Sequence, residues 1–233
     1  MNVIITGASR GLGYAMAEKF AANGHNLYLC SQNEVLLYKA METLTTKYPN
    51  ITIKATPFDL SDKKQVSSLG HWILDFGISV DVLINNAGQF LPGSVYNEEE
   101  GVLEKMIAVN LYSAYYLTRL LLPVVMKQKS GHIFNICSIA SFQAYPNGGS
   151  YSISKFALAG FSKNLREEMK PHGIKVTTVY PGAAYTDSWA ASGIDKNRFM
   201  EAKDIADMIF ASSQLSAQAC VEDIVLRPQL GDI

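Results

Sequence analysis

The chain has 233 residues, of which 48% are hydrophobic and 18% are charged, a composition typical of one globular domain with a sizeable core. The 20 basic residues nearly balance the 21 acidic ones, so the net charge of −1 gives no indication of a nucleic-acid or anionic-membrane partner. The four histidines are scattered without metal-ligand spacing, and we expect no metal site.

Short apolar runs rich in β-branched residues alternate with longer amphipathic stretches along the whole chain. The predicted strands are Asn2–Thr6, Asn26–Ser31, Ile51–Phe58, Val82–Asn85, His132–Ser138, Lys175–Tyr180 and Val221–Leu226. The predicted helices are Leu12–Asn23, Glu34–Tyr48, Lys63–Phe76, Glu98–Lys127, Tyr151–Lys170 and Ala202–Ser212. Nearly continuous hydrophobic strands, each followed by a crossover helix, indicate a parallel sheet covered on both faces. With right-handed crossovers, residues 1–233 are predicted to form a single doubly wound α/β domain, which binds ligands at the carboxyl ends of its strands.

Cysteine usage and hydropathy bear on the compartment. Cys30, Cys137 and Cys220 are isolated in apolar stretches and are expected to be buried free thiols rather than disulfides. A glycine-rich turn follows Met1 closely, which leaves no room for a signal peptide, and Arg119 interrupts the most apolar stretch before it could span a membrane. We therefore expect a soluble cytoplasmic protein.

The first predicted strand leads through TGASRGLG, residues 6–13, directly into a helix. Glycines let the backbone approach a pyrophosphate, and the start of the helix offers unpaired N–H groups and the positive end of a dipole. The spacing is Gly-x3-Gly-x-Gly rather than the common G-x-G-x-x-G fingerprint, so a purely structural turn stays an alternative.

The second predicted strand ends at Ser31, and Gln32 follows where an NAD site usually has an acid. Arg10 in the glycine turn could meet a 2′-phosphate, so NADP(H) is favoured over NAD(H). Asp59 and Leu60 follow the third strand, where Asp59 is placed to accept a hydrogen bond from an adenine amine. Its alternative role is to order the turn before the next helix.

Three further segments are predicted to reach the same edge of the sheet. Asn86-Ala87-Gly88 follows the fourth strand, and its small residues would let a ribose lie against the backbone. The loop 139–150 returns the chain from Ser138 to Tyr151, which starts YSISK and lies four residues before Lys155. The last of these segments is the turn PGAAYT at 181–186.

Together these motifs resemble the short-chain dehydrogenase/reductase family along essentially the whole chain. The matching motifs are TGASRGLG at 6–13, Asp59, NNAG at 85–88, Asn110, Ser138, YSISK at 151–155 and PGAAYT at 181–186. The resemblance implies a Rossmann-like sheet of seven parallel strands and hydride transfer between NAD(P)H and a carbonyl or alcohol. The cofactor-binding residues it implies are Gly7, Ser9, Arg10, Gly11, Leu12, Gly13, Ser31, Gln32, Asp59, Leu60, Asn86, Ala87, Gly88, Asn110, Tyr151, Lys155, Pro181, Gly182, Ala184 and Thr186.

The resemblance also implies the catalytic roles. Tyr151 transfers the proton, and Ser138 hydrogen-bonds the substrate oxygen. Lys155 holds the nicotinamide ribose, and Asn110 holds a water that relays protons through Lys155. For Asn110, the alternative reading is a helical side chain that bonds its own backbone.

Proton transfer by Tyr151 requires a more acidic phenol, because a free tyrosine has a pKa near 10. Lowering it by about 2–3 units needs roughly 3–4 kcal/mol. Residues four apart share a helix face, and a cation about 4 Å away is worth about 4 kcal/mol at an effective dielectric near 20. We therefore expect the Lys155 ammonium to acidify Tyr151, helped by the positive nicotinamide ring of the oxidised cofactor. A packed Tyr beside a solvated Lys is the plainer alternative.

The substrate is expected to bind against aromatic side chains. Candidates for the pocket wall are Phe90, Phe142, Tyr145, Tyr185, Trp189, Phe199 and Met200. Of these we select Tyr145 and Trp189 as substrate-binding residues, together with Ser138 and Tyr151. A mostly apolar lining suits a modest carbonyl compound or a flat ring.

The function predicted from this reading is reversible, NADP(H)-dependent reduction of a small ketone or aldehyde. Reduction of 3-oxoacyl groups on acyl-carrier protein is the alternative enzyme activity, but the ending VEDIVLRPQLGDI is more similar to sepiapterin reductases and 3-hydroxy-acid dehydrogenases. The alternative of another class is a non-catalytic dinucleotide-binding regulator. Such a protein would need only the nucleotide loops, whereas this sequence also has Ser138, Tyr151, Lys155 and Asn110. The apolar faces of the two longest helices would join subunits into a homodimer or homotetramer, as in the family.

Overall fold

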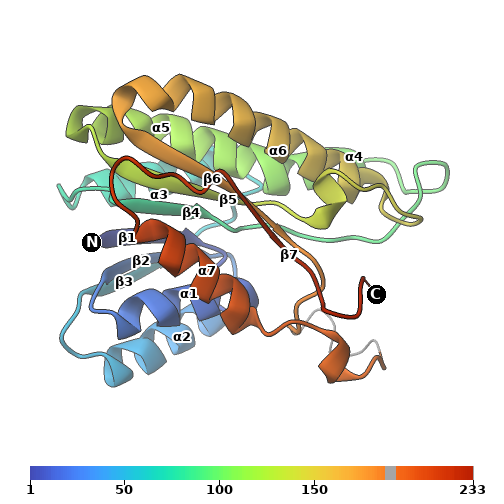
Figure 1. The fold of residues 1–233 in the computed structure, drawn as a ribbon, viewed down its shortest axis with the longest axis horizontal. Coiled ribbons are helices and arrows are strands. Elements are labelled where there is room, and N and C mark those ends of the chain that lie inside the picture. The colour runs from blue at the N-terminus through green and yellow to red at the C-terminus, as the bar shows by residue number, and fades with distance from the viewer. Residues whose placement is uncertain (187–192, 233) are drawn as a thin grey trace.

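The computed structural model describes residues 1–186 and 193–232. In these residues, seven parallel strands form one sheet in the order β3-β2-β1-β4-β5-β6-β7 (Figure 1). Their bounds are β1 Asn2–Thr6, β2 Asn26–Ser31, β3 Ile53–Pro57, β4 Val82–Asn85, β5 Gly131–Ile136, β6 Ile174–Pro181 and β7 Asp223–Leu226. The strand order reverses between β1 and β4, which is where a doubly wound sheet opens a crevice for a ligand.

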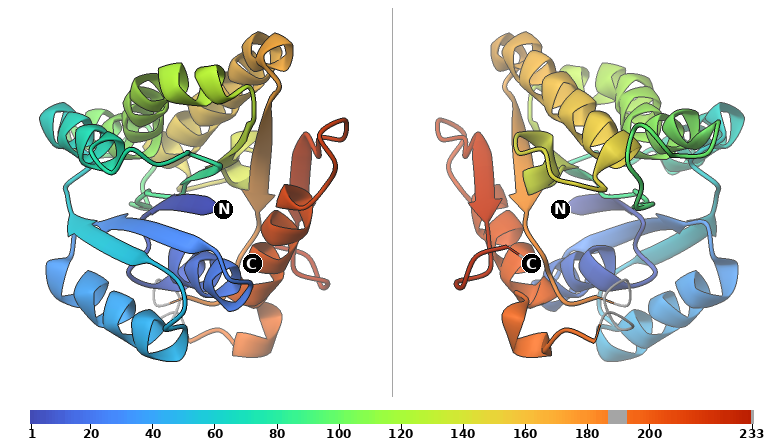
Figure 2. Two further views of the ribbon diagram at one scale, coloured as in Figure 1. Left: turned by 90° about the vertical axis from the view of Figure 1, so that its left-hand side faces the viewer. Right: turned by 90° about the vertical axis from the view of Figure 1, so that its right-hand side faces the viewer.

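Helices cover both faces of the sheet, as the side views show (Figure 2). One face packs against α1 Gly11–Ala22, α2 Glu34–Lys47 and α7 Ala202–Ser213, and the other against α3 Lys63–Leu74, α5 Ser113–Gln128 and α6 Gly149–Met169. Successive strand residues point to opposite faces: Val3 and Ile5 join the first core cluster, and Ile4 joins the second. The predicted doubly wound α/β fold is therefore confirmed.

The helix predicted over Glu98–Lys127 is wrong in its first part. The chain is irregular up to Gly101, which has φ +87°, and α4 Val102–Ile107 follows. A π-helical turn over Ala108–Tyr112 then leads into α5. This single wider turn carries the buried Asn110, whose side chain bonds residues outside its own helix.

Strand ends differ from the prediction by one to two residues. β5 ends at Ile136 rather than Ser138, because Ser138 instead caps a short 3₁₀ turn, accepting a hydrogen bond from the Ala140 N–H at 3.1 Å. β3 and β7 both start two residues later than predicted.

The three cysteines are all free thiols, but only two are buried. Cys30 and Cys137 lie in the core, and Cys220 is exposed in the segment before β7, contrary to the expectation. No helix among residues 1–186 and 193–232 has the length and hydrophobicity needed to cross a membrane.

Candidate active site

A cavity of about 580 Å³ lies at the carboxyl edge of the sheet, on the β1–β4 switch point. It brings together residues from turns that are far apart in sequence. Of the predicted cofactor residues, it is lined by Gly7, Ser9, Arg10, Gly11, Leu12, Gly13, Ser31, Gln32, Asp59, Leu60, Asn86, Ala87, Gly88, Tyr151, Lys155 and Thr186. Asn110, Pro181, Gly182 and Ala184 are absent from this lining.

The glycine turn packs closely against its own backbone and against Asn86. Gly7 has φ +66°, a region that favours glycine. A Cβ on Gly13 would lie 2.1 Å from the Gly7 carbonyl oxygen and 2.7 Å from Asn86 Nδ2, so only glycine fits there. The first turn of α1 has no side-chain cap and no acidic residue, which leaves its N–H groups to bind an anion. These features fit the pyrophosphate of a dinucleotide.

The end of the cavity away from Tyr151 is lined by residues that follow β2 and β3. The Ser9 and Ser31 hydroxyls lie 2.9 Å apart, and Arg10, the residue after Ser9, also lines the cavity. Asp59 accepts hydrogen bonds from the Ser61 N–H at 2.9 Å and from Gln32 Nε2 at 2.9 Å. The turn-ordering role predicted as the alternative for Asp59 is therefore present, while its carboxylate also lines the cavity.

At the inner end of the cavity, Tyr151 lies near the start of α6, and Ser138 follows β5. Burial raises the pKa of the Tyr151 phenol above its ordinary value, and a hydrogen bond with the Ser138 hydroxyl opposes that rise. The edge of the Phe90 ring packs against Tyr151, with ring centroids 4.9 Å apart. The phenol is thus held protonated, with a hydroxyl partner, near neutral pH.

Lys155 is buried with 5% of its surface exposed, and its Nζ donates a hydrogen bond to the Ile136 carbonyl at 2.8 Å. The ammonium lies 5.8 Å from the centroid of the Tyr151 ring, so the two side chains share a helix face as predicted. At the Tyr151 phenol, burial outweighs the Lys155 charge, and the expected acidification by Lys155 together with an oxidised nicotinamide stays a prediction. Burial lowers the pKa of Lys155 and raises that of Tyr151, because both charged forms lose hydration.

Asn110 connects the segment after β4 to α6. Its Oδ1 accepts from the Gln89 N–H at 2.7 Å, and its Nδ2 donates to the Gln89 carbonyl at 3.0 Å and to Ser154 Oγ at 2.8 Å. A Cβ on Gly88 would lie 3.1 Å from Asn110 Oδ1 and 3.5 Å from Lys155 Nζ, so the three groups adjoin. A longer contact joins Nδ2 to Met106 Sδ at 3.9 Å, so the Asn110 side chain bonds other side chains and the Gln89 backbone rather than its own helix backbone, which was the alternative.

A family model described as short chain dehydrogenase matches residues 1–197. The chain belongs to the short-chain dehydrogenase family. It is similar to an uncharacterized oxidoreductase of Staphylococcus epidermidis, with 28% identity over 227 residues that cover 97% of this chain and 96% of that protein. The chain is accordingly an oxidoreductase of this family.

Two solved structures give the same assignment. A metagenomic short-chain oxidoreductase in complex with NADP has a TM-score of 0.85 and 27% identity, over 98% of this chain and 97% of that one. A short-chain dehydrogenase of Sphingobium yanoikuyae in complex with NADPH has a TM-score of 0.84 and 28% identity, over 98% and 88%. These complexes support a nicotinamide dinucleotide as the cofactor of this short-chain dehydrogenase.

The turn after β6 shapes the cavity of this short-chain dehydrogenase mainly through its last residue. Thr186 packs against the glycine turn, where a Cβ on Gly11 would lie 3.3 Å from Thr186 Cγ2. Gly182 instead packs against Pro228, and Ala184 is buried and pairs with Met200. Pro181, the last residue of β6, is likewise buried. These three predicted cofactor residues therefore orient the turn rather than line the cavity.

The predicted substrate residues have mixed outcomes. Tyr145 packs over Gly148, where a Cβ would approach its ring to 3.2 Å, and burial raises the pKa of its phenol to about 12. Tyr185 packs against Phe199, with ring centroids 5.7 Å apart. Trp189 lies outside the described residues.

Several lining residues were not predicted. These are Asn33, Leu36, Phe58, Val109, Ile136 and Cys137. Val109 and Cys137 each precede a predicted catalytic residue, so proximity in sequence was an available signal for them. Leu36 and Phe58 carried no signal, because an apolar residue in a helix or at a strand end is read as core.

Proposed function

We propose that this short-chain dehydrogenase is an NADP(H)-dependent reductase of small, uncharged carbonyl compounds that also oxidises the corresponding alcohols. The observation that supports this proposal is the Tyr151 phenol, which lines the cavity together with the buried Lys155 and is hydrogen-bonded to Ser138, a residue outside that lining. Among the described lining residues, the charged side chains are Arg10, Asp59 and Lys155. We assign all three to the cofactor, so none of the described lining residues is left as a counter-ion for a charged substrate.

In the proposed reduction, Ser138 and Tyr151 both donate hydrogen bonds to the carbonyl oxygen and polarise it. A bound reduced nicotinamide supplies the hydride that forms the new C–H bond on the carbonyl carbon. The Tyr151 O–H breaks as its proton moves to the oxygen, which gives the alcohol and a phenolate. Lys155 stabilises that phenolate, and the proton returns to it from solvent, for which we propose the route through Asn110 and Lys155.

The raised pKa of Tyr151 suits this direction. Carbonyl reduction starts from the protonated phenol, which is the form that burial favours. Alcohol oxidation starts from the phenolate, so its rate should climb with pH below the pKa of Tyr151.

The preference for NADP(H) over NAD(H) rests on the residues after β2. There is no acid among Ser31, Gln32 and Asn33, and Arg10, the residue after Ser9, lines the same cavity as the paired Ser9 and Ser31 hydroxyls. A 2′-phosphate needs cationic and hydroxyl donors, whereas a free ribose diol is usually held by a carboxylate.

The proposal is tested by following NADPH consumption with a panel of ketones, aldehydes, diketones, pterins and an acetoacetyl thioester. We expect turnover of small neutral carbonyls. Tyr151→Phe should lower kcat roughly 10²–10⁴-fold, the usual contribution of a general acid, while the Kd for NADPH changes less than twofold. Preference for the thioester would favour the alternative, acyl-carrier-protein-linked reduction. Full activity in Tyr151→Phe would exclude the assigned acid.

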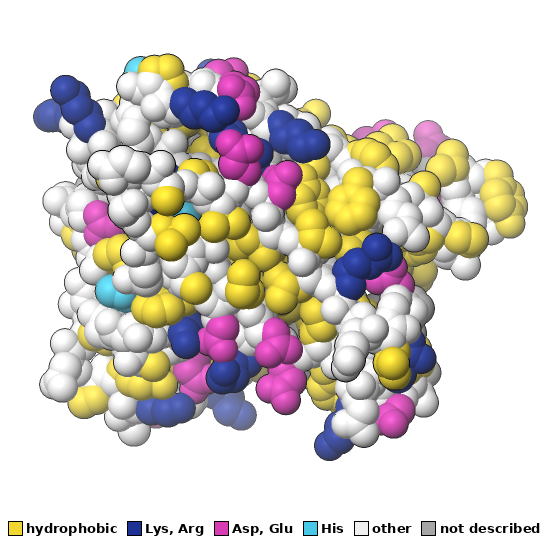
Figure 3. All heavy atoms as spheres, viewed as in Figure 1, with side chains coloured by type: hydrophobic (Ala, Val, Ile, Leu, Met, Phe, Trp, Pro, Cys, Tyr) yellow, Lys and Arg dark blue, Asp and Glu magenta, His cyan; other side chains and the backbone are white. Residues whose placement is uncertain are grey.

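We also propose that the protein works as a homo-oligomer. Exposed apolar side chains on α6 and β7 support this, namely Ile153, Phe156 and Val225, which are 44%, 46% and 53% exposed. Hydrophobic atoms gather across the middle of the face over β7 (Figure 3). Sedimentation that finds only monomers at working concentration would refute an oligomer.

A further inference from the structure

The helix that carries Tyr151 and Lys155 begins without a cap of its own. Its N-cap residue is Gly148, which has no side chain, and its first turn has no acidic residue. Tyr151 is only the third residue of α6. The N–H groups of this first turn therefore need an acceptor from elsewhere in the chain, because fraying would displace the phenol directly.

Glu98 supplies that acceptor from 52 residues away. Its carboxylate accepts a hydrogen bond from the Ser150 N–H at 2.8 Å and a second, short one from the Ser150 hydroxyl. Ser150 is only 2% exposed and immediately precedes Tyr151. A negative charge on the first turn of a helix is also favourable to the helix dipole.

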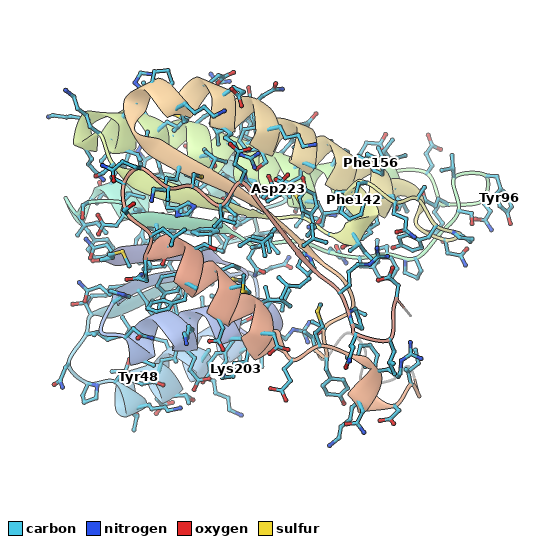
Figure 4. All side chains as sticks on the ribbon, in the orientation of Figure 1. Tyr48, Tyr96, Phe142, Phe156, Lys203 and Asp223 are labelled. Atoms are coloured by element: carbon cyan, nitrogen blue, oxygen red, sulfur yellow. The ribbon has the colours of Figure 1, made fainter. Side chains whose placement is uncertain are left out.

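Two glycines make room for this contact. A Cβ on Gly149 would lie 2.0 Å from Glu98 Oε1, and a Cβ on Gly93 would lie 2.6 Å from Glu98 Cγ. Gly93 also donates its N–H to the Asn147 carbonyl at 3.1 Å. The segment 89–98 is thus joined to the start of α6 by both backbone and side chain. Its outer end carries the exposed Tyr96 (Figure 4).

The other end of the same segment contacts the catalytic groups. Gln89 is bonded to Asn110 through both backbone groups, and Phe90 packs against the Tyr151 ring. Residues 89–98 are therefore attached at one end to Asn110 and Tyr151. At the other end they are attached to the N–H group of Ser150, the residue before Tyr151. A shift of α6 at either attachment would move the phenol relative to Ser138.

We propose that Glu98 is a positioning residue, which fixes the start of α6 so that the Tyr151 phenol meets the substrate oxygen. This inference rests on the proposed function, in which Tyr151 is the proton donor. Glu98 is not in the lining of the dinucleotide cavity, so its effect should fall on the reaction rather than on cofactor binding.

The test compares Glu98→Ala and Glu98→Gln with Glu100→Ala, which removes an exposed carboxylate two residues away. We expect Glu98→Ala to lower kcat 10- to 100-fold, because a misplacement of about 1 Å can cost 10²-fold, with the Kd for NADPH changed less than twofold. Glu98→Gln should recover kcat to within fivefold of wild type, since its amide oxygen accepts from the Ser150 N–H and its NH₂ donates to the hydroxyl. Glu100→Ala should match wild type.

Ser150→Ala provides a second, milder perturbation. It removes the hydroxyl bond to Glu98 and keeps the N–H bond, so it should lower kcat two- to fivefold. Adding it to Glu98→Ala should cause no further loss, because Glu98→Ala already removes the partner of the Ser150 hydroxyl. Unchanged kcat in Glu98→Ala, or an equal loss in Glu98→Gln and Glu98→Ala, would overturn the proposal.

Amide hydrogen exchange over 149–155 separates this inference from the proposed function. If the wild-type protein turns over none of the carbonyls tested, the proposed function fails, but the exchange measurement still tests the cap. Exchange at least tenfold faster in Glu98→Ala, with wild-type rates in Glu98→Gln and Glu100→Ala, supports the cap by Glu98. Equal rates in all four proteins refute it.

Discussion

Acid should destabilise this enzyme through one buried histidine. His132, in β5, is 5% exposed and stacks on Phe134, and its Nε2 lies 2.7 Å from Thr177 Oγ1. Because the Thr177 hydroxyl donates to the Val221 carbonyl at 2.5 Å, the imidazole must donate from Nε2. Its Nδ1 is buried and has no hydrogen-bond partner among the described residues, so protonation there would leave a charge and a donor unsatisfied. Burial, aided by the nearby Lys175 charge, accordingly lowers the pKa of His132 to about 3.

The magnitude follows from the difference between this pKa and the unfolded value of about 6.5. Between those two pH values the unfolded chain binds the proton and the folded chain does not, so the free energy of unfolding falls as pH falls. The loss is about 1.4 kcal/mol per pH unit, or about 2 kcal/mol at pH 5 relative to pH 7.5. With an m-value of about 2–3 kcal/mol/M, the urea midpoint should move down by about 0.7–1 M.

The assay is urea unfolding followed by circular dichroism at several pH values between 7.5 and 4.5. His132→Asn removes the titrating group and should reduce the fall in unfolding free energy between pH 7.5 and pH 5 by about 2 kcal/mol. His71→Asn is the matched control, because His71 is an exposed histidine on α3, and it should keep the wild-type slope. An unchanged slope in His132→Asn would refute the assignment of the acid sensitivity to this buried imidazole.

Three other predictions concern the cavity and the thiols. Arg10→Ala should weaken NADPH binding about 10- to 100-fold, which is the contribution of a charged hydrogen bond, and should leave NADH binding nearly unchanged. Calorimetry measures both affinities, and equal losses for the two cofactors would contradict the 2′-phosphate assignment. Gly13→Ala should abolish dinucleotide binding, because its Cβ would lie 2.1 Å from the Gly7 carbonyl oxygen. The control Gly160→Ala, which has open space around its Cβ, should bind normally. Retained binding in Gly13→Ala would show that the turn can relax. A thiol reagent at neutral pH should modify only Cys220 in the folded chain and all three cysteines in urea; fast reaction of a buried thiol in the folded state would contradict the packing.

The periodicity of the sequence was sufficient for the sheet, because strands covered on both faces are nearly continuous apolar runs. β1, β2 and β4 have the predicted bounds. Bounds failed where side chains override local preference: Ser138 leaves the strand to cap a 3₁₀ turn. The acidic run that begins at Glu98 is typical of a helix start, but the Glu98 carboxylate binds the first turn of α6 instead.

The electrostatics of the site could not be predicted from spacing. A four-residue interval places Lys155 beside Tyr151 on the helix, but burial and the Ile136 carbonyl depend on tertiary packing. For the same reason Asn110 could be assigned to the site only through the family resemblance. Its bonds to Gln89 and Ser154 join three separate parts of the chain.

A row of buried polar side chains lies between α6 and the sheet. Asn85 donates to Asn135 at 2.8 Å, Asn135 to Ser162 at 3.0 Å, and Thr178, itself bonded to Ser162 at 2.8 Å, accepts from Arg166 at 3.0 Å. Ser162 follows Lys155 by seven residues, close to two full turns of α6, so both side chains leave the helix in nearly the same direction. A translation or rotation of α6 relative to the sheet would break several of these hydrogen bonds at once. A purely hydrophobic contact would tolerate such a movement. The buried amides and hydroxyls between α6 and the sheet therefore fix the direction of the Lys155 side chain. Substitutions that enlarge the proposed substrate pocket on the other side should leave that direction unchanged.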